Sequence, residues 1–195
     1  MATSSCRIRP VNYETDGVSV IEISDSWMYS AAVLLGLILL VGGWKLAALV
    51  TPGFGMDPVL ALSSTVTVAI FVLSILVHEM IHTVTLLTIG GCRWADVRLG
   101  ISWRSLTPYV SWSGPIALRH YQASVLAPFL AMGLVPFVLG CWFNAPVVVA
   151  WAVLMISAAA GDLVLFSRTV GLPGQSVVWD NQKMLGFSAI LPTPE

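Results

Sequence analysis

Two histidines and a glutamate within five residues, His78, Glu79 and His82, are the side chains best placed for chemistry. On an α-helix two histidines four positions apart lie about 40° apart around the axis, so both imidazoles can bind one metal ion. Glu79 projects about 100° away from His78 and can hold a water molecule beside that ion. This spacing is typical of zinc hydrolases, in which the histidines are metal ligands and the glutamate is the general base.

The motif lies inside an apolar stretch that extends from about Pro58 to Ile89. Ionisable groups are costly at membrane depth unless they are paired or functional, so three of them in five residues indicate a site. The pattern predicts a metal hydrolase with its active site within the bilayer. We expect Glu79 to be the catalytic base and Zn²⁺ to be the cofactor, bound by His78 and His82.

The composition places the chain among membrane proteins, because 57% of its 195 residues are hydrophobic and only 10% are charged. A net charge of −1 and the lack of a basic cluster argue against a nucleic-acid partner. Cys6, Cys92 and Cys141 are far apart in the sequence, so they indicate neither a disulfide framework nor a Cys-x-x-Cys zinc site.

Hydrophobic segments predict an α-helical integral membrane protein with a single membrane domain over residues 1–195. Four transmembrane helices are expected at about 26–50, 58–89, 121–143 and 146–166, followed by a C-terminal tail at 167–195. Gly90 and Gly91 end the second helix, whereas Pro128 and Pro136 are expected to interrupt the third.

The surface segment 92–120, between the second and third helices, differs in composition from its neighbours. It is rich in β-branched and aromatic residues, with runs at 94–101 and 107–112 that predict a small surface β-hairpin. Residues 18–23 have the same character and predict a further strand.

Positive charges predict the orientation in the membrane. Of the nine Lys and Arg residues, all except Lys45 precede the first expected helix, follow the fourth, or lie between the second and third. With four spans these segments share one side of the membrane, so we expect a multi-pass protein with both termini in the cytoplasm.

Asp162 is the candidate for a third metal ligand, because catalytic zinc normally takes three protein ligands and leaves one position for water. It lies in the fourth expected helix, at a depth that can match His78 and His82, and small residues at 158–161 would let two helices approach closely. The alternative is that Asp162 pairs with Lys45 or with a backbone donor.

The chain resembles the putative zincin peptidase family of small four-span membrane proteins and, more distantly, the site-2 class of intramembrane metalloproteases. The resemblance rests on the motif at 78–82, the stretch from Tyr121 to Pro128, the pair Gly161–Asp162 and residues 177–180. Site-2 proteases carry their ligand aspartate in the order Asp-Gly, which is reversed here. The resemblance implies zinc and peptide-bond hydrolysis.

We therefore expect an intramembrane zinc metalloprotease that cleaves a membrane protein or peptide substrate and has the lipid bilayer as its other partner. One alternative is a non-catalytic membrane protein in which the metal is a structural clamp, with a fourth protein ligand closing the site. Another is a metal transporter, which would need further polar residues along a route through the membrane. A bis-histidine haem site needs ligands from opposing directions, which two histidines on one helical face do not offer. The sequence does not indicate an oligomeric state.

Overall fold

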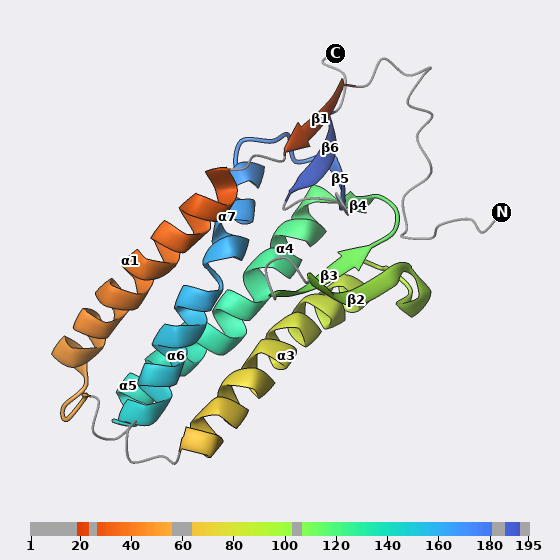
Figure 1. Cartoon of the computed structure of the whole chain (residues 1–195). Coiled ribbons are helices and arrows are strands. Elements are labelled where there is room, and N and C mark those ends of the chain that lie inside the picture. The colour runs from red at the N-terminus through yellow and green to blue at the C-terminus, as the bar shows by residue number, and fades with distance from the viewer. Residues whose placement is uncertain (1–18, 24–26, 56–63, 103–106, 181–185, 192–195) are drawn as a thin grey trace.

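The computed structural model describes residues 19–23, 27–55, 64–102, 107–180 and 186–191 (Figure 1). Helices dominate these ranges, and they are α1 (Trp27–Val50), α3 (Ser64–Thr88), α4 (Leu118–Pro128), the π-helical segment η2 (Phe129–Leu134), α5 (Val135–Trp142), α6 (Pro146–Ala158) and α7 (Ala160–Thr169). Strands form two small antiparallel sheets towards one end of the helices.

Three helical segments are long and apolar enough to cross a membrane: Trp27–Val50, Ser64–Thr88 and Leu118–Trp142. Helices α6 and α7 meet the same test only as a pair, and they are bent by 48° relative to each other. The described residues therefore contain three candidate spans, or four if the bent pair is one span. Residues 58–63, the expected start of the second span, lie outside the described ranges. Placement and orientation in a bilayer stay predictions.

The prediction that Pro128 and Pro136 interrupt the third span is wrong, because α4, η2 and α5 follow one another without a break. Pro128 has φ −65° and ψ −41°, which are ordinary helical values. Between the two prolines the backbone forms π-type hydrogen bonds, such as that from the Val135 N–H to the Leu130 carbonyl, five residues back. A proline removes one donor, and the helix continues around that loss.

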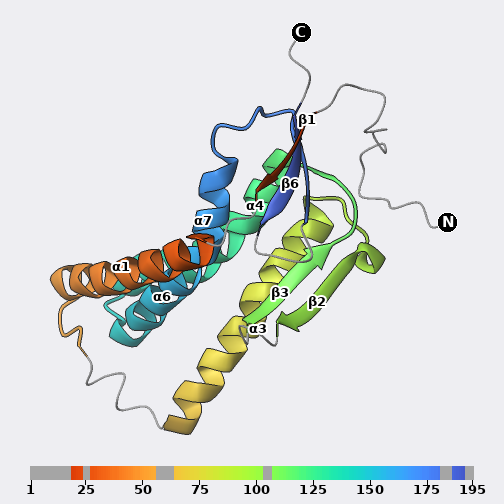
Figure 2. The same ribbon diagram turned by 45° about the horizontal axis from the view of Figure 1, so that its top comes forward.

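The predicted hairpin is present between α3 and α4. Strand β2 (Val97–Ser102) pairs with β3 (Thr107–Trp112), and the hairpin lies beside α3 (Figure 2). The first strand begins later than expected, because Trp94–Asp96 form a 3₁₀ turn, η1. In that turn the Asp96 N–H donates to the Arg93 carbonyl and the Asp96 carboxylate accepts from the Arg93 N–H.

A four-stranded sheet covers the end of α4, with the strand order β1-β6-β5-β4. Its members are β1 (Ser19–Ile23), β4 (Ile116–Ala117), β5 (Val177–Asp180) and β6 (Phe187–Leu191). The sequence predicted β1, whereas β5 and β6 fall in the segment expected to be a tail. Strand β6 pairs with β1 over Ser19–Ile23, so this sheet joins the two ends of the described chain.

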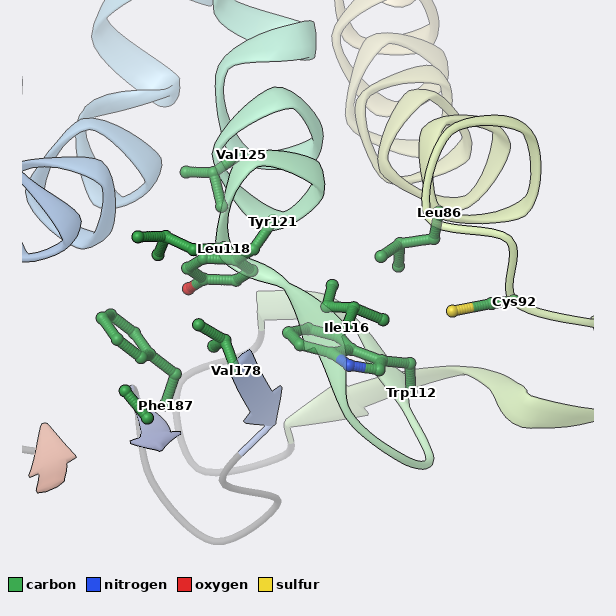
Figure 3. Packing of buried hydrophobic residues seen from close by; sticks show 10 residues of the cluster. Leu86, Cys92, Trp112, Ile116, Leu118, Tyr121, Val125, Val178 and Phe187 are labelled. Carbon is green, nitrogen blue, oxygen red and sulfur yellow. The ribbon is translucent and has the colours of Figure 1, made fainter. Parts of the chain in front are cut away.

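An apolar cluster attaches this sheet to α4 (Figure 3). The buried Tyr121 ring lies between Trp112 and Phe187, with ring centroids 5.5 Å and 5.1 Å away. Val178 from β5 and Leu86 from α3 belong to the same cluster. Burying aromatic rings in this way fixes how α3, α4 and the strands sit relative to one another.

Within the helical layer, α1 and α3 lie on opposite sides (Figures 1 and 2). Helix α1 packs against α6 and α7, whereas α3 packs against α4 and the hairpin, and α4 also contacts α7. Close approach between α5 and α6 depends on Gly140, where an added Cβ would lie 2.8 Å from Val149 Cγ2 and 3.1 Å from the Val149 backbone nitrogen. Small residues commonly bring apolar helices together in this way.

The substitution Gly140→Ala should lower the thermal stability of the detergent-solubilised protein, by about 1–3 kcal/mol, because the stiff Val149 side chain and its backbone must move. The matched control is Gly42→Ala in α1, where an added Cβ meets nothing within 4 Å. Thermal unfolding of the two variants beside the wild type measures the difference. Equal melting temperatures for G140A and G42A would contradict the packing shown here.

Candidate metal site

Helix α3 carries both motif histidines on one face, one turn apart. The His78 and His82 ring centroids are 5.0 Å apart, as expected for helical spacing. The hydroxyls of Thr83, Thr85 and Thr88 donate to carbonyls four residues back in the same helix. These hydroxyls are therefore satisfied within α3, as an apolar helix requires.

Helix α7 brings Asp162 to the histidines. Asp162 Oδ2 lies 3.0 Å from His78 Nε2, and its Oδ1 lies 3.5 Å from His82 Nε2. The residue sits in the first turn of α7, just after the bend that separates α6 from α7. The two histidine side chains are each 12% exposed and the aspartate side chain is 17% exposed, so the group is largely enclosed but not sealed.

The three side chains form a donor set that fits zinc. One ligand atom from each of His78, His82 and Asp162 lies within 4.8 Å of the others. Zinc bonds of about 2.0–2.2 Å at tetrahedral angles place ligand atoms about 3.3–3.5 Å apart, which is close to the two measured separations. Two imidazoles and one carboxylate are also the ligand types that catalytic zinc sites use. The ligand roles of these residues stay a prediction.

The second ring nitrogen of His82 supports the same interpretation. His82 Nδ1 lies 2.8 Å from the Ser124 backbone carbonyl of α4, so it donates a proton there. In the neutral ring this leaves a lone pair on Nε2, which faces another acceptor, Asp162 Oδ1. Two acceptors facing each other need a cation between them, either a metal ion or a proton on His82. Metal-bound histidines commonly have such a carbonyl partner on their other nitrogen.

A second polar contact reaches α3 one turn before His78. The Trp151 Nε1–H of α6 donates to Ser74 Oγ at 2.8 Å, and Ser74 Oγ donates to the Ile70 carbonyl at 2.7 Å. Ser74 is buried, whereas the first ten residues of α3, Ser64–Leu73, are all exposed. This contact therefore ties α6 to α3 close to the histidines.

The remaining predicted catalytic residue, Glu79, is half-buried on α3 and interacts electrostatically with both histidines and Asp162. Its neighbour Met80 is exposed. Asp162 contacts His78 and His82, and the ion pairs found in the described ranges include none between Asp162 and Lys45. His120, the third histidine of the chain, is not part of the group.

Sequence reasoning missed Ser124 and Trp151. Ser124 contributes a backbone carbonyl, which no side-chain pattern reveals, although Pro128 four residues later was a usable signal. Trp151 resembles any aromatic residue of an apolar helix, and its role depends on Ser74, 77 positions away in the chain. Both contacts join helices that the sequence does not place next to each other.

Comparison with protein families gives a match over the middle of the chain. The profile of a family described as putative zincin peptidases matches residues 71–177, which is more than half of the chain. The matched region contains His78, Glu79, His82 and Asp162. Searches of curated proteins and of solved structures give no match.

Metal analysis of the purified protein tests the site. Wild type should contain one zinc per chain, and His78→Ala, His82→Ala and Asp162→Ala should each lose it, because each removes one of three ligands. His120→Ala is the matched control, since it removes a histidine outside the group and should keep the metal. Full zinc content in Asp162→Ala would exclude this aspartate as a ligand.

Proposed function

Because this chain belongs to the putative zincin peptidase family, we propose that it is a zinc-dependent metallopeptidase that cleaves peptide bonds within or near the membrane. The observation that carries the proposal is the meeting of His78, His82 and Asp162, from two apolar helices, beside Glu79. Ionisable groups inside a membrane carry a cost in free energy unless they are paired or functional. Metal binding would offset that cost.

In this proposal His78, His82 and Asp162 hold the metal. A bound zinc ion would polarise the scissile carbonyl and make a water molecule acidic enough to lose a proton near neutral pH. The ligand side chains retain some exposure, which access by water and by an extended chain segment would require. A fully enclosed group would not allow this.

Glu79 acts as the general base. It takes a proton from the water molecule that attacks the scissile carbonyl carbon, and a carbon–oxygen bond forms. When the carbon–nitrogen bond breaks, Glu79 gives that proton to the leaving nitrogen, which departs as an amine. Glu79 interacts electrostatically with His78, His82 and Asp162, which supports this role.

The depth of the group supports cleavage close to one membrane face. His82 lies six residues before the end of α3 at Thr88, which is about 9 Å along the helix axis. That end of α3 is the one nearest the four-stranded sheet (Figure 1). The positive charges assign this face to the cytoplasm.

The composition of the ligand group favours a catalytic role over a structural clamp. A structural zinc site is closed by four protein ligands, whereas the group found in the described ranges has three. The fourth position would then be available to water. For these reasons we place the metallopeptidase before a structural metal site or a transporter.

The substitution Glu79→Gln should abolish cleavage of a co-expressed membrane substrate while zinc content and melting temperature stay at wild-type values. The amide keeps the size of the carboxylate but cannot accept the proton. Met80→Ala, which changes the exposed neighbour, is the control and should retain cleavage. Wild-type cleavage by E79Q would remove Glu79 as the base.

We also propose that the hairpin holds the substrate in an extended form. A helical peptide bond is shielded by its own turn, so a substrate must be extended where it is cut. Strands β2 and β3 pair with each other and with no other described strand, which leaves an edge for strand addition. The hairpin lies beside α3, the helix that carries the two histidines (Figure 2).

A photo-crosslinking amino acid at Leu99 of β2 should capture a substrate of the Glu79→Gln variant. The same probe at Leu34 of α1 should not, because α1 lies on the opposite side of the helical layer (Figure 1). Both side chains are exposed, at 51% and 61%, so the probe itself is equally accessible. Capture at Leu34 but not at Leu99 would contradict the proposal that the substrate binds along the hairpin.

A further inference from the structure

We infer that Pro128 is a positioning residue of the metal site, because it leaves the Ser124 carbonyl free to orient His82. This inference rests on the proposed zinc site. It assigns a role to a residue that is not one of the possible metal ligands.

The first step is a missing donor in α4. In an α-helix the carbonyl of residue i accepts the N–H of residue i+4, and for Ser124 that position is Pro128, which has no N–H. The next N–H along the chain, that of Phe129, donates to the Leu126 carbonyl. The Ser124 carbonyl therefore lacks its helical donor although it lies in an unbroken helix, and a buried carbonyl of this kind needs another partner.

The second step is the partner that it finds. His82 Nδ1 lies 2.8 Å from the Ser124 carbonyl oxygen, a good hydrogen-bond distance. A second hydrogen bond joins the same two residues, because the Ser124 hydroxyl donates to the His82 carbonyl at 3.4 Å. Ser124 and Pro128 are both buried, so water does not compete for this carbonyl.

The third step is the effect on the ligand atom. A hydrogen bond from Nδ1–H selects the tautomer in which Nε2 carries the lone pair, and Nε2 is the atom that faces Asp162. It also fixes the plane of the ring. If Pro128 had an N–H, that group would compete for the same carbonyl and the other tautomer of His82 would gain population. Outer hydrogen bonds of this type typically change metal affinity by about 10–100-fold when they are lost.

Pro136 provides the matched comparison within the same helical path. It is the second proline of this path, eight positions further along in α5. In α-helical register the carbonyl whose donor it removes is that of Met132, whose side chain is buried and apolar and which belongs to no ligand group. A general effect of proline on this helix would appear at both positions, whereas the proposed role belongs to Pro128 alone.

Two substitutions, Pro128→Ala and Pro128→Val, restore the backbone N–H at a position whose helical φ and ψ suit both residues. We expect each variant to bind zinc about tenfold more weakly than wild type in a chelator competition assay, because a carbonyl with two lone pairs can keep part of the His82 bond. Nitrogen-15 NMR of the three histidines should show a smaller share of His82 with a proton on Nδ1 in the zinc-free variants than in the zinc-free wild type. Pro136→Ala should match wild type in both measurements.

The outcomes separate this inference from the proposed function. If wild type binds no zinc, the proposed function fails. If wild type binds zinc and P128A and P128V bind it equally well with an unchanged His82 tautomer, the inference is wrong. It is also wrong if only P128A loses affinity, since valine fills most of the space of the ring and the loss would then come from packing. Weaker binding in P136A as well would make the effect a property of the helix rather than of Ser124.

Discussion

The contact between one carboxylate and two imidazoles inside an apolar helical layer is the constraint on which this structure depends. An unpaired charge in such surroundings costs several kcal/mol or more, so Asp162 must have partners of opposite charge or a cation. The two ionic contacts between Asp162 and the motif histidines join α3 to α7. The position of α3 relative to α7 therefore depends on the same contacts that form the site.

Helices α3 and α7 reach this arrangement mainly through α4, which packs against both of them. Two contacts hold α3 in place on either side of His78: the Trp151–Ser74 hydrogen bond one turn before it, and the bond between His82 and Ser124 one turn after it. Gln122 Nε2 of α4 donates to Thr169 Oγ1 of α7 at 3.0 Å, and this hydrogen bond joins α4 to α7. Side-chain and carbonyl hydrogen bonds are strong in apolar surroundings, so a few of them can set the geometry.

The apolar cluster under the four-stranded sheet extends this support to the strands. Tyr121 lies one turn before Ser124 on α4 and is packed between Trp112 and Phe187. The position of the Ser124 carbonyl is thus fixed by aromatic packing on one side and by Pro128 on the other. The family match ends at the first residue of β5, so β6 adds to this packing from outside the matched region.

The sequence by itself determined the local part of the site. Helical periodicity places His78, Glu79 and His82 together wherever a helix forms, and apolar composition identifies the helices. The hairpin and β1 followed from β-branched and aromatic runs. Asp162 could be proposed only because few other ionisable groups lie at a suitable depth, and its meeting with α3 needed the fold. Tertiary structure alone decided the roles of Ser124, Trp151 and the strands β5 and β6, because each depends on partners far away in the chain. A backbone carbonyl, an indole and an edge strand carry no pattern that identifies such a partner in advance.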